Sequence, residues 1–199
     1  MAKKKIYAVK KGFQTGLFQT WDQCKKAVDG YSGAEFKSFT DEEEAMDYLG
    51  LKEQEKIQVP DNMVIAYVDG SFEKSVNKYS YGCILLTPDG KETRKSGNGD
   101  DPACAAIRNV AGEMLGAMNA VKWAKENGYK GIEIRYDYQG IEKWVTGAWR
   151  TKNELTSKYA QYMQKSGRTI HISFCKVAAH TGDFYNEQAD KLAKEALYQ

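Results

Sequence analysis

The alternation of apolar and polar positions divides the chain into two blocks. Residues 3–49 form the first block. Its period-two segments predict strands at residues 5–10, 17–19 and 34–39. Its helical periods predict helices at 20–28 and 40–49, opened by the capping boxes Thr20–Gln23 and Thr40–Glu43. This block is therefore expected to be a small ββαβα domain with a three-stranded sheet, occupying residues 1–49.

The second block, residues 62–199, follows a polar stretch at 50–61 that predicts a linker. Its pattern predicts strands at residues 63–68, 80–86, 91–96, 131–136 and 169–177. Helices are expected at residues 109–127, 139–144, 153–165 and 185–198. Hairpin strands followed by alternating helices and strands indicate an α/β domain with a mixed sheet.

Composition excludes several classes of protein. The chain has 199 residues, 42% of them hydrophobic, but no apolar run approaches the roughly 20 residues that span a bilayer. The basic start lacks the apolar segment of a secretory signal. The four cysteines have no zinc-ligand or redox spacing, so we expect reduced thiols and a cytoplasmic location.

The formal net charge of +2 hides an uneven distribution. Residues 1–40 carry eight lysines against three acids, and residues 41–47 carry five acids and no base. The first block therefore offers a basic surface, as a nucleic-acid partner would require.

Four carboxylates stand at positions where a site could form. Asp69 and Asp137 each follow an apolar strand, Glu113 borders the apolar face of a helix, and Asp190 lies beside the apolar stripe of the last helix. Ligand sites in such sheets form at strand ends, where converging carboxylates would need hard cations to neutralise them. Two Mg²⁺ ions would suit phosphodiester hydrolysis.

Each acid also has an ordinary explanation. Asp69 and Gly70 could form a plain turn, and Glu113 could be a favourable charge early in a helix. Asp190 and Lys194 could be a surface pair four residues apart. Spacing alone leaves these alternatives open.

Four motifs resemble those of the ribonuclease HI family, in the same order. They are Val68–Ser71, Gly112–Leu115, Tyr136–Gln139 and Ala179–Ala193. The last is the most specific, because it has the family pattern His-x-Gly followed by Asn-x-x-x-Asp. The resemblance covers 62–199 and implies the ribonuclease H fold, a mixed five-stranded sheet with helices on both faces.

The resemblance also implies the chemistry. Asp69, Glu113, Asp137 and Asp190 would bind two Mg²⁺ ions, with Mn²⁺ as a possible substitute. The enzyme would cleave the RNA strand of RNA–DNA hybrids and leave 5′-phosphate and 3′-hydroxyl ends. His180 would assist proton transfer or product release, and its alternative is an exposed loop imidazole.

Two further residues have two readings each, and a third belongs to a motif that is only partly kept. Asn186, one turn before Asp190, is either a residue behind the metal ligands or a simple helix-start residue. Trp144 matches the family's tryptophan in the DNA-strand channel, or packs in the core. Asn109 keeps the family's asparagine four residues before Glu113, but the surrounding phosphate-pocket motif is altered.

Residues 4–49 resemble the hybrid-binding domain found at the N-terminus of many ribonucleases HI. The resemblance implies that Tyr7, Trp21, Phe36 and Lys37 contact the substrate. Lysines bind phosphates and aromatic rings stack on sugars or bases. Tyr7 and Phe36 could instead serve only the small core.

The expected function is an RNA–DNA hybrid endoribonuclease whose first domain raises hybrid affinity, acting as a monomer with no small-molecule substrate or membrane. Two alternatives remain. One is a hybrid-binding protein with weak catalysis, and the other is a nuclease of the same fold that acts on DNA.

Overall fold

The computed structural model describes residues 5–50, 57–177 and 183–199. The chain divides into two compact units, residues 1–56 and residues 57–199. Each unit has its own hydrophobic clusters.

The N-terminal unit is a three-stranded antiparallel sheet in the order β2-β1-β3. Its elements are β1 (Ile6–Lys11), β2 (Gly16–Phe18), α1 (Trp21–Val28), β3 (Glu35–Phe39) and α2 (Glu42–Leu49). Val9 packs with Cys24 of α1 on one face of the sheet, and Ala8 packs with Ala45 of α2 on the other. This confirms the expected ββαβα arrangement.

The two helix starts of this unit differ from each other. Thr20 caps α1 as predicted, because its hydroxyl accepts the Gln23 N–H at 3.3 Å. The predicted Thr40–Glu43 box is wrong, since the cap of α2 is Asp41. One Asp41 carboxylate oxygen accepts the N–H groups of Glu43 and Glu44, at 2.8 and 3.2 Å. A carboxylate at this position satisfies two free helix donors and also suits the helix dipole.

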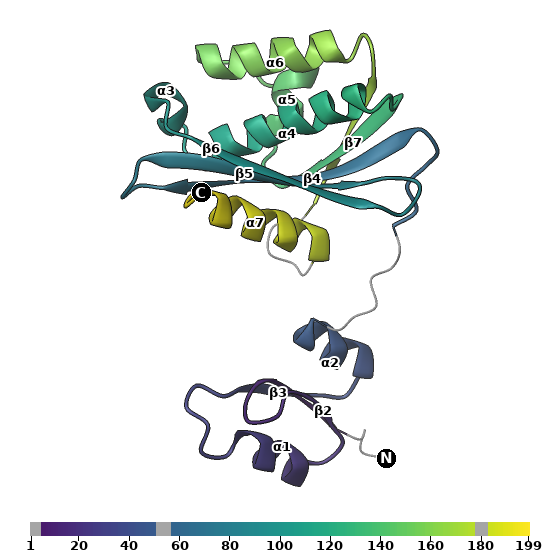
Figure 1. Cartoon of the computed structure of the whole chain (residues 1–199), viewed down its shortest axis with the longest axis vertical. Helices are drawn as coiled ribbons and strands as arrows, with labels where there is room; N and C mark the ends of the chain where they lie inside the picture. Colours follow the sequence, from purple (N-terminus) through teal and green to yellow (C-terminus); the bar gives the residue numbers. More distant parts are fainter. Residues whose placement is uncertain (1–4, 51–56, 178–182) are drawn as a thin grey trace. The chain divides into compact units, whose positions relative to one another are not determined.

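The C-terminal unit is a five-stranded mixed sheet in the order β6-β5-β4-β7-β8. Its strands are β4 (Met63–Glu73), β5 (Lys78–Leu86), β6 (Glu92–Gly99), β7 (Gly131–Tyr136) and β8 (His171–Lys176). Its helices are α3 (Pro102–Ala105), α4 (Asn109–Glu126), α5 (Gly140–Thr146), α6 (Glu154–Ser166) and α7 (Phe184–Ala196). Helices α4, α5 and α6 lie over one face and α7 lies on the other (Figure 1). The expected sheet with helices on both faces is confirmed.

Strand β4 is longer than predicted. The strand does not end at Asp69 but continues to Glu73, and it stays paired with β5 as far as the Glu73–Lys78 pair. The Asp-Gly-Ser sequence reads as a turn signal, yet here Gly70 lies under α4. A Cβ on Gly70 would overlap the backbone of Asn109 and Glu113, so a glycine is needed for α4 to approach the sheet.

Residues just before β4 belong to the C-terminal unit. Ile57 and Val59, placed in the linker by the sequence pattern, pack against the apolar cluster beneath α7 that contains Ile65 and Tyr67. Across the described ranges, the structure contains no helix with the length and apolarity needed to cross a membrane.

Candidate active site

Strand pairing brings Asp69 and Asp137 to neighbouring positions. β4 and β7 are parallel, and their last recorded pair is Tyr67 with Arg135. Asp69 and Asp137 each come two residues later, so they lie on the same face at the same level of adjacent strands. Both side chains are partly buried.

Glu113 reaches the same place from α4. It is 1% exposed, which is rare for a carboxylate. Its Oε1 accepts the backbone N–H of Tyr138 at 3.3 Å, immediately after Asp137. Helix α4 therefore delivers this carboxylate to the end of β7.

Asp190 comes from the opposite layer. In the β4–β5 ladder Asp69 stands opposite Gly82, and a Cβ on Gly82 would lie 2.6 Å from the Ala193 nitrogen of α7. The missing side chain lets the α7 backbone approach the sheet beside Asp69. Asp190 also pairs with Lys194, with 2.6 Å between Oδ2 and Nζ, as the surface-pair alternative predicts, and its place in the site stays a prediction.

The electrostatics show that the acids converge. Burial and, to a smaller extent, the nearby charges of Asp137 and Asp190 together raise the pKa of Asp69 to about 7, against the lowering effect of the Gly70 N–H. Burial raises the pKa of Glu113 well above its usual range, with Asp137 and Asp69 contributing in the same direction. Four carboxylates therefore influence one another across the strand ends.

This donor set fits divalent cations by its chemistry. Carboxylate oxygens are the ligands that Mg²⁺ and Mn²⁺ prefer, and a cation would remove the repulsion that raises these pKa values. In the part of the chain that the structure describes, no three His, Cys, Asp or Glu side chains are already grouped around one ion position. The acids are near one another without forming a closed cage.

Asn186 lies on the same side of α7 as Asp190. At 100° per residue the two side chains differ by about 40° around the helix axis. Asn186 is 5% exposed, and its Oδ1 has no hydrogen-bond partner among the described residues. A buried oxygen without a donor marks a place where a further group can bind.

Two further residues, His180 and Asn109, were predicted to belong to the site. His180 lies outside the described residues. Asn109 is the first residue of α4 and is exposed, next to Arg108, which has a φ of 55°. A non-glycine residue in that region of backbone space is strained, so the altered motif has its own local conformation.

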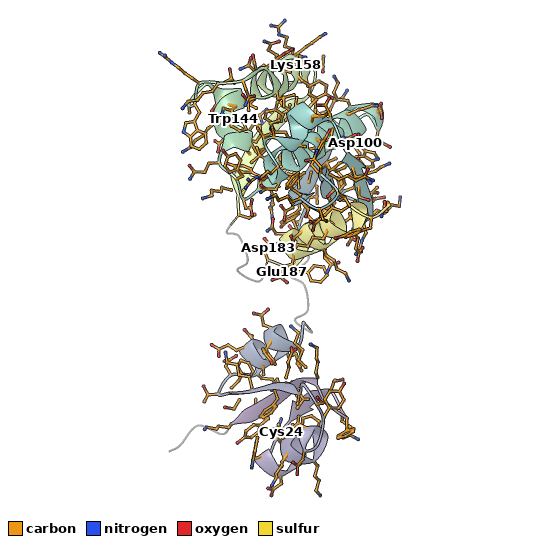
Figure 2. The ribbon with its side chains drawn as sticks, turned by 90° about the vertical axis from the view of Figure 1, so that its left-hand side faces the viewer. Cys24, Asp100, Trp144, Lys158, Asp183 and Glu187 are labelled. Atoms are coloured by element: carbon orange, nitrogen blue, oxygen red, sulfur yellow. The ribbon has the colours of Figure 1, made fainter. Side chains whose placement is uncertain are left out.

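The C-terminal unit has a pocket of about 700 Å³, and its lining includes Tyr138, the residue after Asp137. It is lined by Ile107, Val110, Tyr138, Trp144, Ala148, Trp149, Arg150, Lys152, Asn153 and Thr156. The ring centroids of Trp144 lie 5.7 Å from Tyr138 and 6.3 Å from Trp149. Trp144 therefore packs against other rings and also lines a cavity, and its place in a DNA-strand channel stays a prediction. Figure 2 shows Trp144 on the opposite side of the sheet from Asp183 and Glu187 of α7.

The sequence analysis missed Trp149 in this cluster. Trp149 lies beyond the end of α5, where Gly147 has a φ of 79° and reverses the chain. The Trp149 N–H then bonds the Lys143 carbonyl at 2.9 Å, and the Lys143 ammonium lies 4.9 Å from the centre of the Trp149 ring. Trp144, Gly147 and Trp149 were visible in the sequence. Residues five positions apart do not lie on one face of a helix, so the spacing did not indicate that the two tryptophans meet.

The N-terminal unit gathers three of its four predicted contact residues. Trp21 lies 5.6 Å from Tyr7 and 5.9 Å from Phe36 between ring centroids, and Trp21 and Phe36 are 45% and 40% exposed. Lys37 points to the other face of the edge strand β3, where its Nζ lies 5.2 Å from the centre of the Phe39 ring. The rings of Trp21 and Phe36 are therefore too exposed to serve only as core residues.

Comparison with known proteins assigns both units. The sequence model described as Ribonuclease H1 N-terminal domain matches residues 5–49, and the RNase H model matches residues 61–198. Ribonuclease H1 of Rattus norvegicus is 26% identical over 257 residues, covering 98% of this chain and 90% of the relative. Ribonuclease H of Saccharomyces cerevisiae is 52% identical over 45 residues, 23% of this chain and 13% of the relative.

Solved structures agree with this assignment. The crystal structure of RNase H1 from Halobacterium salinarum has a TM-score of 0.56 at 29% identity, covering 68% of this chain and 98% of that chain. LC11-RNase H1, solved in complex with an RNA/DNA hybrid, has a TM-score of 0.56 at 17% identity, covering 68% and 96%. The second likeness supports the fold alone.

Proposed function

Because this chain belongs to the ribonuclease H family and carries a ribonuclease H1 N-terminal domain, we propose that it is an endonuclease that hydrolyses the RNA strand of RNA–DNA hybrids. We further propose that the products have 5′-phosphate and 3′-hydroxyl ends. The observation that carries the proposal is the convergence of Asp69, Glu113, Asp137 and Asp190. Burial, together with the nearby charges of Asp137 and Asp190, raises the pKa of Asp69 to about 7.

The carboxylates would hold two Mg²⁺ ions, with Mn²⁺ as a possible substitute. When bound, such ions supply an activated water molecule and stabilise the departing 3′ oxygen. Asp69 would hold the ions together with Asp137 and Asp190, whose charges lie near enough to raise its pKa. Asp137 would serve the side of the attacking water, and Glu113 the side of the leaving group and the RNA 2′-hydroxyl.

Two residues would assist the carboxylates. The free Oδ1 of Asn186 would accept a hydrogen bond from a water molecule at the ion site, behind Asp190. His180 would assist proton transfer or product release, since an imidazole titrates near working pH. The resemblance to the family motif supports this role for His180.

The aromatic pocket would take the DNA strand. Tyr138, Trp144 and Trp149 offer ring faces for deoxyribose or bases, and Arg150 and Lys152 offer charges for phosphates. Asn109, exposed at the start of α4, would contact the hybrid near Glu113.

The N-terminal unit would raise hybrid affinity through Tyr7, Trp21, Phe36 and Lys37. Since both units belong to one chain, binding by one raises the effective concentration of the hybrid at the other. We expect a monomer, because one chain supplies all four carboxylates. The four cysteines are free, which agrees with a reducing cytoplasmic location.

One cleavage assay tests the function. Labelled RNA–DNA hybrid, duplex DNA and duplex RNA are incubated with the protein in Mg²⁺ or in EDTA, alongside Asp137→Asn. We expect cleavage of hybrid RNA only, dependent on Mg²⁺ and lost in the variant. Hybrid binding without cleavage would indicate a binding protein, and cleavage of duplex DNA would indicate a nuclease of another specificity.

A further inference from the structure

Ser80 on β5 contacts both of the helices that carry carboxylates. It is fully buried and stands opposite Ser71, two residues beyond Asp69 on β4. Helix α4 lies on one side of it and helix α7 on the other. No sequence motif singled it out.

Its side chain holds α7. The Ser80 hydroxyl donates to the Ala193 carbonyl at 2.6 Å, one turn after Asp190. This carbonyl lies in the last turn of α7. The Leu197 N–H, which would reach it in a continuing helix, donates to the Lys194 carbonyl at 3.4 Å. The hydroxyl therefore supplies a donor that the end of the helix lacks.

Its backbone holds α4. A Cβ on Gly112 would overlap the Ser80 carbonyl oxygen and lie 2.9 Å from the carbonyl carbon. Glu113 is the next residue along α4, and its backbone nitrogen is also in close approach to Gly70. The position of Ser80 thus limits how near this turn of α4 comes to the sheet.

We propose that Ser80 is a positioning residue whose hydroxyl fixes Asp190 relative to Asp69 by holding α7, while its backbone lies against α4 beside Glu113. The inference rests on the proposed function, in which these acids hold the cations. A carboxylate held by its helix needs no rearrangement to bind an ion, whereas a loosened one does. Ser80 touches no substrate in this role.

The test variant is Ser80→Ala in the full chain, and Thr87→Val is the matched control. Thr87 is also buried, and its hydroxyl bonds Asp89 and Lys91 at the far end of β5, away from the acids. Mg²⁺ affinity is measured by calorimetry without nucleic acid, and kcat and KM are measured on hybrid. We expect Ser80→Ala to weaken Mg²⁺ binding about tenfold and to lower kcat, with KM for hybrid unchanged.

Thr87→Val should lose comparable stability but keep wild-type Mg²⁺ affinity. Unchanged Mg²⁺ affinity in Ser80→Ala, or equal weakening in both variants, would overturn the proposal. If Ser80→Ala does not fold, Ser80→Cys, which keeps a weak donor, is measured instead; its Mg²⁺ affinity should be several-fold below wild type, and wild-type affinity would overturn the proposal. Hybrid cleavage by the wild-type chain tests the proposed function separately.

Discussion

The Glu113 carboxylate accepts the backbone N–H of Tyr138 across 3.3 Å, and this bond ties α4 to the end of β7. The same side chain is almost fully buried and has a pKa raised well above its usual range, chiefly by burial. Such a carboxylate costs folding free energy when it is ionised. The role that we propose for Glu113 in binding cations explains why the protein has so costly a carboxylate at this position.

Replacing Glu113 with Gln separates charge from shape. The amide oxygen can still accept the Tyr138 N–H, but the negative charge is lost. We expect kcat on hybrid to fall by at least about 100-fold, while the ion-free protein becomes more stable at pH 8. Cleavage rates and urea unfolding in EDTA check both effects. Glu126→Gln, in the same helix but exposed, should change neither.

Asp69 gives the ion-free protein a pH-dependent stability. Its pKa is about 7 in the fold and about 4 in an unfolded chain, so the folded protein keeps a proton that the unfolded chain releases. The free energy of unfolding should therefore fall as pH rises from about 4 to about 7. Asp69→Asn should reduce this slope, leaving the contribution of Glu113, and be more stable than wild type by about 2 kcal/mol at pH 8. Urea unfolding in EDTA across this range decides it, and an unchanged slope would contradict the shift.

Trp149 should contribute to binding more than to folding. It is 38% exposed and lines the pocket with Trp144. A stacked ring is worth about 1–3 kcal/mol, so Trp149→Ala should raise KM for hybrid by about fivefold or more at nearly constant kcat. Steady-state kinetics and thermal unfolding provide the readouts. Tyr198→Ala, which removes another exposed ring, should leave KM unchanged.

Lys37 tests the phosphate contacts of the N-terminal unit. Lys37→Ala should weaken hybrid binding and lower the slope of log affinity against log salt by about one. Titrations at several salt concentrations measure this slope. Lys122→Ala removes an equal charge from α4, where Lys122 faces Glu126, and it should keep the wild-type slope. Equal slopes for Lys37→Ala and wild type would remove Lys37 from the binding surface.

Gly112→Ala should be strongly destabilising. The new Cβ would overlap the Ser80 carbonyl, which belongs to the backbone and cannot rotate away. We expect a loss of about 2–3 kcal/mol, together with weaker Mg²⁺ binding because Glu113 moves with α4. Gly116→Ala, one turn later, meets its nearest atom at 3.3 Å and should cost much less. Denaturant unfolding compares the two.

The sequence predicted most of the elements because their signals are local. The strand at residues 131–136 and the helix from Asn109 both occur where periodicity placed them. The extension of β4 beyond Asp69 was missed, since it depends on pairing with β5 and on the approach of α4 to Gly70. The strand propensity of a segment does not indicate which distant strand or helix it will contact.

The residues of the site likewise divide into those that the sequence indicated and those that it did not. Motif resemblance identified the acids, and the structure brings Asp69, Glu113 and Asp137 together as expected. Ser80 and Trp149 were invisible because their roles come from a helix on the far face and from a chain reversal. When the partner of a residue lies in another layer of the fold, the sequence around that residue contains no pattern that indicates the contact.

The order of the acids along the chain has a kinetic consequence. Asp69 and Asp190 are separated by about 120 residues, and α7 can dock only on a hairpin that has already formed. Ion binding should therefore be among the last properties that a refolding molecule acquires. Tight Mg²⁺ uptake in a stopped-flow experiment would then report completion of the native topology, later than the recovery of helical circular dichroism.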